Sequence, residues 1–198
     1  MKRIFDFIFS IFLLILLSPM LLMIAILIRL ESSGPALFKQ KRVGLHREKF
    51  ICYKFRTMKD DTPDIATNKF VNRNEYLTKV GYFLRKYSLD ELPQLFNIIR
   101  GNMSIVGPRP VIPEEKKLIK KRDQTGVYSL KPGVTGWAQI NGRDHVNIEE
   151  KVELDTFYLK EQSFLFDIKI IFKTAFCVIK REGILEHSSG IDRQEIKK

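Results

Sequence analysis

Residues 7–28 of the chain read FIFSIFLLILLSPMLLMIAILI, a run without a single charged side chain. At roughly 1.5 Å per residue, this run would form a helix about 33 Å long, which is enough to cross the hydrocarbon core of a bilayer. A cleaved secretory signal is not expected, because the run is too long for an h-region and residues 31–35 contain no small-x-small site. The run therefore predicts a helix embedded in a membrane.

The middle and the flanks of this run indicate how the helix enters the membrane. Ser18-Pro19 lies at its centre, where a proline removes a backbone hydrogen bond and kinks the helix, while the serine hydroxyl can satisfy a freed carbonyl. Basic residues flank both ends, namely Lys2, Arg3, Arg29, Lys39, Lys41 and Arg42. Because positive charge favours the cytoplasmic side, we predict a re-entrant helix-break-helix segment over residues 1–30 with both ends on that side. A kinked helix that spans the bilayer is the alternative.

The rest of the chain is basic, and its charge indicates the kind of partner. The 198 residues include 34 Lys and Arg against 23 Asp and Glu, a formal net charge of +11. Such a charge implies nucleic acid, an acidic lipid surface or a phosphorylated substrate, and the apolar run favours the last two. The basic residues are interleaved with acids and no nucleic-acid motif is present, so no nucleic acid is expected. Two distant cysteines and three scattered histidines indicate neither a disulfide framework nor a zinc site, which suits a reducing cytoplasm.

Hydrophobic periodicity predicts an α+β fold that is mostly helical, with one globular domain over residues 31–185 and a frayed tail over 186–198. Two short strands, 36–40 and 50–55, are expected to form a small β-hairpin around a turn at 44–46. Helices are expected at 74–87, 90–99, 114–122, 148–161 and 164–181. The last is a basic amphipathic helix, typical of an interfacial position on anionic lipid, with a core helix as the alternative.

The most informative stretch of the domain is residues 87–97, Tyr-Ser-Leu-Asp-Glu-Leu-Pro-Gln-Leu-Phe-Asn. Pro93 fits a helix only in its first turn, so the helix is expected to begin near Asp90. The partial positive charge there stabilises an ionised carboxylate and attracts phosphate, which brings a nucleophile and its electrophile together. Asp90 is therefore a candidate for attack on a phosphate. In the alternative, Ser88 and Glu91 form a capping box and the acids are structural.

Three further motifs each allow more than one interpretation. In residues 106–110, Val-Gly-Pro-Arg-Pro, two prolines fix the backbone around Arg109, which suits either an arginine that grips a diphosphate oxygen or a rigid surface turn. Residues 60–64, Asp-Asp-Thr-Pro-Asp, are a metal cluster by composition or a solvated turn. The glycine-rich residues 131–143 suit a nucleotide base or a sugar, or merely connect elements.

Several of these motifs, in this order, resemble the bacterial sugar transferases, that is, the monotopic phosphoglycosyl transferases. The shared segments are 2–6 (Lys-Arg-Ile-Phe-Asp), Ser18-Pro19, 53–58 (Tyr-Lys-Phe-Arg-Thr-Met), 88–95 (Ser-Leu-Asp-Glu-Leu-Pro-Gln-Leu), 106–110 and 132–137 (Pro-Gly-Val-Thr-Gly-Trp). The resemblance implies transfer of a sugar 1-phosphate from a UDP-sugar to undecaprenyl phosphate, giving undecaprenyl diphosphate sugar and UMP on the cytoplasmic face of the inner membrane. It implies the first membrane step of capsule, exopolysaccharide or glycoprotein glycan assembly, but specifies neither the sugar nor the pathway.

The resemblance also implies roles for individual residues. Asp90 would be the nucleophile and would form a phosphosugar-aspartyl intermediate. Mg²⁺ would be the cofactor, with Asp90 as its ligand and Glu91 contributing to the site or orienting it. Phosphate oxygens would be bound by Lys54, Arg56, Arg85 and Arg109.

The expected partners are the UDP-sugar donor, the undecaprenyl phosphate acceptor and anionic membrane lipids. The motifs leave open whether the protein forms a homodimer. A non-catalytic membrane scaffold of a polysaccharide assembly complex is the competing hypothesis for its function.

Overall fold

The computed structural model describes residues 2–59, 62, 76–141 and 146–180. Its elements are, in chain order, α1 (Lys2–Glu31), β1 (Leu37–Val43), η1 (Leu45–Arg47), β2 (Lys49–Phe55), α3 (Lys79–Lys86), η3 (Leu89–Glu91), α4 (Gln94–Ile99), β3 (Ser104–Val106), α5 (Lys116–Gln124), η4 (Val127–Ser129), β4 (Gly133–Thr135), α6 (Trp137–Asn141), α7 (Ile148–Glu161) and α8 (Phe164–Lys180). Helices dominate and the strands form two small sheets, so the predicted α+β, mostly helical fold is confirmed. The predicted tail at 186–198 lies outside the described residues.

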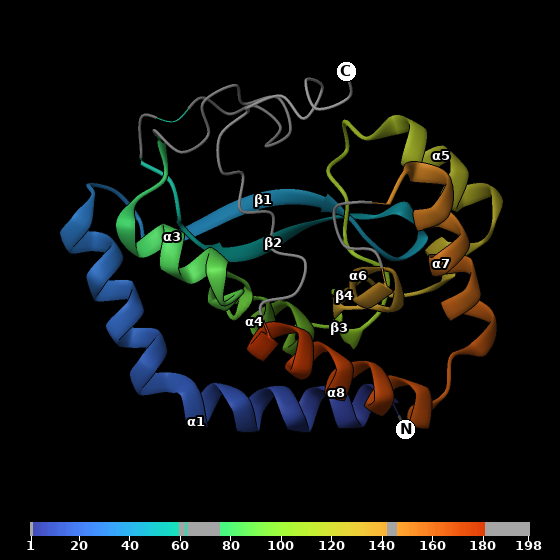
Figure 1. Cartoon of the computed structure of the whole chain (residues 1–198), viewed down its shortest axis with the longest axis horizontal. Coiled ribbons are helices and arrows are strands. Elements are labelled where there is room, and N and C mark those ends of the chain that lie inside the picture. Colours follow the sequence, from blue (N-terminus) through green and yellow to red (C-terminus); the bar gives the residue numbers. More distant parts are fainter. Residues whose placement is uncertain (1, 60–61, 63–75, 142–145, 181–198) are drawn as a thin grey trace, which may run out of the picture.

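Helix α1 is uninterrupted from Lys2 to Glu31 and bends near its middle, so that it curves around one side of the domain (Figure 1). Pro19 lies inside it, and the Ser18 hydroxyl donates to the Ile15 carbonyl at 2.8 Å, as expected of a Ser-Pro pair. The predicted break between two helices is therefore a bend within one helix. Among the described helices, α1 is the one that is long and apolar enough to cross a membrane.

Both ends of α1 are attached to the same globular domain. At its start, the Lys2 ammonium pairs with the Asp167 carboxylate and donates to the Val106 carbonyl at 3.1 Å. At its end, the Glu31 carboxylate accepts from the backbone N–H of Lys79 at 2.6 Å. The helix is thus anchored at both termini, and its bent middle follows the rim of the molecule and packs against the core (Figure 1).

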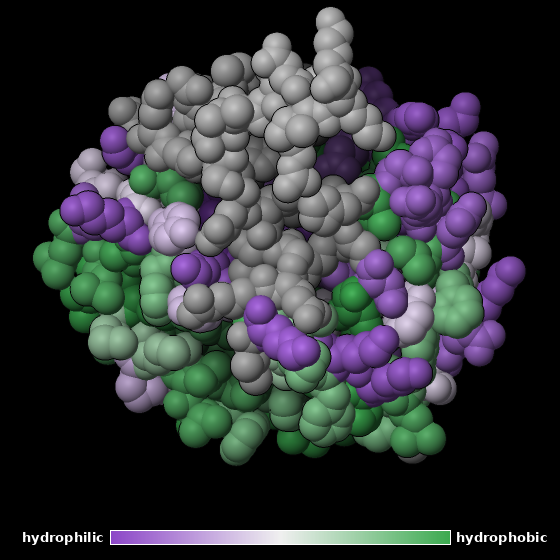
Figure 2. All heavy atoms as spheres, in the orientation of Figure 1, coloured by the Kyte–Doolittle hydropathy of each residue, from purple (hydrophilic) through white to green (hydrophobic). Residues whose placement is uncertain are grey.

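An apolar surface runs along α1 and the neighbouring α8. The ring of Phe5 meets that of Phe164 edge to face, with centroids 5.2 Å apart, so the two helices touch. Large apolar side chains are exposed along both, as the lower rim of Figure 2 shows. These side chains are Ile4, Phe7, Ile8, Phe12, Ile15, Leu16, Leu22, Met23, Ile26, Leu27, Leu30, Phe164, Leu165, Phe172 and Phe176. An exposed apolar area of this extent marks a contact surface, so α8 is not a helix enclosed in the core.

The predicted hairpin is confirmed, and it forms the platform for the site. Strands β1 and β2 pair antiparallel over their whole length. Helix α4 is fixed on β2 by the buried Asn97, whose amide accepts from the Tyr53 N–H at 3.0 Å and donates to the Ile51 carbonyl at 2.6 Å. Because one side chain satisfies two backbone groups of the strand, α4 has a fixed position on the hairpin.

Glycines allow the two halves of the second sheet to pack closely. Strand β3 pairs in parallel with β4. A Cβ atom at Gly107 would lie 2.3 Å from the Lys131 carbonyl oxygen, and one at Gly136 would lie 2.1 Å from that of Gly107. Both distances are far inside van der Waals contact, so these positions require glycine. The glycines of the predicted 131–143 loop therefore serve backbone packing in its described part, whereas residues 142–143 lie outside the description.

Some helix boundaries differ from their predicted positions for local reasons. Helix α3 begins only at Lys79, because the Thr78 hydroxyl caps it by accepting from the Gly81 N–H at 2.9 Å. Helix α4 begins later than predicted, after the 3₁₀ turn η3 that contains Asp90. Helix α5 is displaced slightly toward the C-terminus. Helix α7 coincides with the predicted range 148–161.

Candidate active site

Asp90 and Glu91 lie in η3, the 3₁₀ turn between α3 and α4. Ser88, which precedes the turn, has a left-handed backbone conformation with φ 55° and makes no side-chain capping bond. The capping-box interpretation is therefore wrong, and the Glu91 carboxylate turns to Lys54 of the hairpin instead. Two adjacent carboxylates in one tight turn repel each other, so the site depends on nearby cations.

Glu91 is held by two cations from different segments. The Lys54 ammonium on β2 donates to Glu91 Oε1 at 2.7 Å, and the Arg109 guanidinium donates to the same oxygen at 2.9 Å. The side chains of Glu91 and Lys54 are 14% and 17% exposed, whereas that of Arg109 is 45% exposed. Burial raises the pKa of Glu91, but Arg109 and Lys54 outweigh burial and hold the pKa below its usual range. Glu91 is therefore ionised and fixes two of the predicted phosphate-binding cations.

Asp90 contrasts with its neighbour, because no side chain of the described residues donates a hydrogen bond to its carboxylate. Burial and the negative charge of Glu91 raise the pKa of Asp90 above its ordinary value, while Lys54, Arg85 and Arg109 oppose that shift. The oxygens of Asp90 keep their acceptor capacity for a ligand. The pair thus divides into a carboxylate that holds cations of the protein and a carboxylate to which no described side chain donates.

The structure brings Arg85 to this cluster and places Arg56 elsewhere. Arg85, in the last turn of α3, donates from Nε to the Thr57 hydroxyl at 2.8 Å, and its charge acts on Asp90. Arg56 is 7% exposed and donates to the carbonyl of Ser32 at 2.7 Å, just beyond α1. The other predicted site residues gather around Asp90, and the phosphate contact of Arg56 stays a prediction.

Sequence reasoning missed four polar residues that support the cluster: Asn97, Arg42, Arg122 and Asp155. Arg42 lines a small cavity of about 10 Å³, with room for one water molecule, together with Cys52, Lys54, Gln94, Arg109 and Pro110. A signal for Arg122 and Asp155 was present in the helical pattern. Arg122 follows the buried Leu118 by one helical turn, and Asp155 lies between the buried Val152 and Tyr158. A charge on the buried face of a helix indicates a paired group inside the domain.

Asp90 is also the residue that fits the expected Mg²⁺. This ion keeps several waters and is usually bound by one or two carboxylates together with substrate phosphates. The Asp90 carboxylate, beside cations that are predicted to bind phosphate, suits such a site, whereas Glu91 is already paired. Within the described residues, no group of three His, Cys, Asp or Glu side chains could hold a metal by itself. The alternative cluster at 60–64 lies outside the description except for Thr62.

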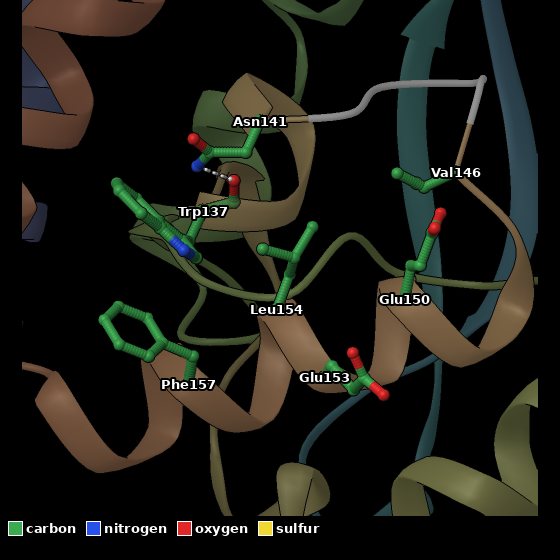
Figure 3. A pocket seen from close by; sticks show the side chains of 7 residues that line it. All are labelled: Trp137, Asn141, Val146, Glu150, Glu153, Leu154 and Phe157. Carbon is green, nitrogen blue, oxygen red and sulfur yellow. Dashed lines mark hydrogen bonds between the residues drawn. The ribbon is translucent and has the colours of Figure 1, made fainter.

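A larger hollow of about 610 Å³ lies between α6 and α7 (Figure 3). Its walls are formed by Trp137, Asn141, Val146, Glu150, Glu153, Leu154 and Phe157. The rings of Trp137 and Phe157 stack with centroids 5.6 Å apart. Glu150 completes the capping box of α7 by accepting from the Asn147 N–H at 3.2 Å. Two carboxylates and no Lys or Arg are among these walls, so the hollow is less suited to a diphosphate than the cluster of cations around Asp90.

Comparison with known proteins defines the class to which this fold and site belong. The family described as bacterial sugar transferase matches residues 1–181, and the chain belongs to that family. It is therefore an enzyme of the transferase class. The "Uncharacterized sugar transferase EpsL" of Bacillus subtilis (strain 168) is 43% identical over 184 residues, which cover 93% of this chain and 90% of the relative.

Two longer relatives carry names that state a reaction. The undecaprenyl-phosphate galactose phosphotransferase of Salmonella typhimurium is 39% identical over 92% of this chain and 41% of its own length. The UDP-glucose:undecaprenyl-phosphate glucose-1-phosphate transferase of Escherichia coli (strain K12) is 41% identical over 89% of this chain and 39% of its own length. The chain thus matches only a part of these two proteins.

Proposed function

We propose that the protein transfers a sugar 1-phosphate from a UDP-sugar to undecaprenyl phosphate, giving undecaprenyl diphosphate sugar and UMP. The observation that carries this proposal is the open carboxylate of Asp90 beside a Glu91 that Lys54 and Arg109 hold. The names of the Salmonella and Escherichia relatives support the lipid acceptor, and the second also supports the donor. One of them is named for galactose and the other for glucose at similar identity, so the sugar stays open.

The reaction consists of two displacements at one phosphorus. First, a carboxylate oxygen of Asp90 attacks the phosphorus that bears the sugar. The bond from that phosphorus to the bridging oxygen breaks, and UMP leaves with the electron pair. A phosphate oxygen of undecaprenyl phosphate then attacks the same phosphorus and expels the Asp90 carboxylate. One diphosphate bond replaces another, so no separate energy source is required.

The cations around Asp90 counter the repulsion between reacting anions. Lys54 and Arg109 are already placed by Glu91 Oε1, so they need no rearrangement when a diphosphate arrives. Arg109 is the more exposed of the two and is the better placed to grip substrate. A bound Mg²⁺, with Asp90 as a ligand, would supply further positive charge to the diphosphate.

The attachment of α1 supports a re-entrant topology. Because Lys2 at one end and Glu31 at the other contact the same domain, both ends lie on one side of the membrane. We place that domain on the cytoplasmic face, with the apolar surface of α1 and α8 in the adjoining leaflet. Asp90 would then meet the phosphate of the lipid at headgroup level. Single cysteines added before residue 1 and at Ser33 should both react only from the cytoplasmic side; labelling of either from outside intact cells would contradict this topology.

The direct test of the activity uses purified protein in lipid nanodiscs containing undecaprenyl phosphate, with Mg²⁺ and a panel of UDP-sugars. At least one sugar should release UMP, with one lipid-linked product formed for each UMP. Chelation of Mg²⁺ by EDTA should stop the release, and added Mg²⁺ should restore it. Folded protein that releases no UMP with any sugar would contradict the proposal and favour the non-catalytic scaffold.

A further inference from the structure

The turn that carries Arg109 is held by donors from several elements. Four successive carbonyl oxygens of the turn accept one hydrogen bond each. The carbonyl of Pro108 accepts from the Gly133 N–H at 3.0 Å, and that of Val111 accepts from the Val43 N–H at 2.9 Å. Between them, the carbonyl of Arg109 accepts from Arg122 Nη1 at 2.8 Å, and that of Pro110 accepts from Arg42 Nη1 at 3.1 Å. Two of the four donors are therefore arginine side chains, which come from β1 and α5.

Arg122 is the more buried of these two arginines. Its side chain is 2% exposed, and its Nε and Nη2 both donate to Asp155 Oδ2, at 2.9 and 2.6 Å. That geometry leaves Nη1 to the carbonyl of Arg109. Burial of such a pair brings little net stability, since well-packed apolar residues often do as well. We therefore expect the pair to act through the backbone carbonyl of Arg109, which Arg122 holds.

Arg42 holds the opposite side of the turn. It is half-buried on β1, where Nη1 donates to the carbonyl of Pro110 and Nη2 donates to the Gln40 side chain. It also borders the small cavity shared by Lys54 and Arg109, so three cations surround the same space. Mutual repulsion would push these cations apart unless their backbones and side chains were fixed.

We propose that Arg122, held by Asp155, is a positioning residue that acts together with Arg42 to place Arg109 for the transfer reaction. The two prolines of the turn have no N–H to donate, so around Arg109 the attachment depends on the carbonyls of residues 108–111. The Arg109 side chain extends from this fixed backbone to Glu91 and is 45% exposed. Small displacements of a positioned group lower the rate strongly, so loss of either arginine should reduce transfer without removal of a substrate contact. This inference rests on the proposed function.

A double-mutant cycle with UMP release as the readout tests it. Arg122→Lys keeps a positive charge for Asp155, but one ammonium cannot reproduce the three arginine bonds. We expect kcat/KM to fall roughly 10- to 100-fold in the wild-type background. In an Arg109→Ala background, where the guanidinium to be positioned is missing, the same change should have almost no further effect. Arg42→Met should follow the same pattern, and it serves as the second probe if Arg122→Lys does not fold.

The matched control is Arg47→Met, which removes an arginine that pairs with Asp123 of α5 at 2.9 Å but does not touch the turn. It should leave kcat/KM unchanged, and thermal unfolding should confirm that all variants are folded. Equal losses in the wild-type and Arg109→Ala backgrounds would overturn the positioning role, as would folded Arg122→Lys and Arg42→Met variants of full activity. Full activity of Arg109→Ala itself would overturn the role of Arg109. No UMP release by the wild type would overturn the proposed function.

Discussion

The pair of Arg122 with Asp155 and the cluster of Arg109 with Glu91 both join an arginine to a carboxylate, but they differ in what else can reach them. The side chains of Arg122 and Asp155 are each 2% exposed, and the arginine directs two donors to one carboxylate oxygen. Around Glu91, Arg109 is 45% exposed, and the adjacent Asp90 has no hydrogen-bond donor among the described side chains. A sealed and fully matched pair can only hold structure. A reachable cluster with an open carboxylate can bind and react.

The largest effect should come from Asp90→Asn, which removes the proposed nucleophile from the reachable cluster. We expect UMP release to fall by at least about 10⁴-fold, as for other enzymes that lose their nucleophile. The melting temperature should hardly change, because no bond to a described side chain is lost. Residual transfer within about tenfold of the wild type would exclude Asp90 as the nucleophile.

Substitutions in the buried pair of Arg122 and Asp155 should lower the free energy of unfolding. Asp155→Ala leaves Arg122 buried and unpaired, which typically costs about 3–5 kcal/mol, measured as the free energy of unfolding in denaturant. Replacing both residues, Arg122→Met with Asp155→Leu, should recover most of that loss but not the transfer activity, because nothing then holds the carbonyl of Arg109. A double variant with wild-type kcat/KM would show that the pair does not position Arg109.

Glu91→Gln should have an intermediate effect and sharpen the distinction between the adjacent acids. The amide keeps the shape of the side chain but loses the charge that fixes Lys54 and Arg109. We expect kcat/KM to fall about 10- to 100-fold, since the cations would be less well placed, while turnover persists. Activity as low as that of Asp90→Asn would mean that Glu91 itself takes part in the chemistry.

The smallest effect is expected at Asp123, the direct neighbour of Arg122 on the surface of α5. Its ion pair with Arg47 has side chains that are 44% and 58% exposed. Solvent screens such pairs, so Asp123→Asn should change the free energy of unfolding by about 0–1 kcal/mol and leave transfer unaffected. A loss of stability comparable to that of Asp155→Ala would show that the exposed pair of Asp123 and Arg47 stabilises the fold as strongly as the buried pair of Arg122 and Asp155.

Features that depend on local periodicity could be predicted from the sequence. The α7 helix coincides with the predicted 148–161, and the hairpin forms where two apolar runs flank a turn. Asp90, Glu91, Lys54, Arg85 and Arg109 were named as site residues, and the structure gathers them. The resemblance to a family contributed most to that set, since spacing alone left Asp90 between a nucleophile and a cap.

Features that depend on distant contacts could not be predicted. Lys2 and Arg3 were interpreted as charges that orient a membrane helix, but Lys2 pairs with Asp167 and Arg3 donates to the carbonyls of Ile98 and Ile99. The partner of a charged side chain is set by which elements the fold brings together, and no spacing encodes it. The re-entrant topology proposed for α1 therefore rests more on its two attachments than on its flanking charges.

The most direct test of the central claim is intact-protein mass spectrometry after incubation with Mg²⁺ and the UDP-sugar that supports UMP release, without lipid acceptor. We predict a mass increase of one sugar phosphate in the wild type, a smaller adduct fraction in Glu91→Gln and no adduct in Asp90→Asn. Addition of undecaprenyl phosphate should remove the adduct. The same adduct on Asp90→Asn, or its location at any residue other than Asp90, would contradict the account.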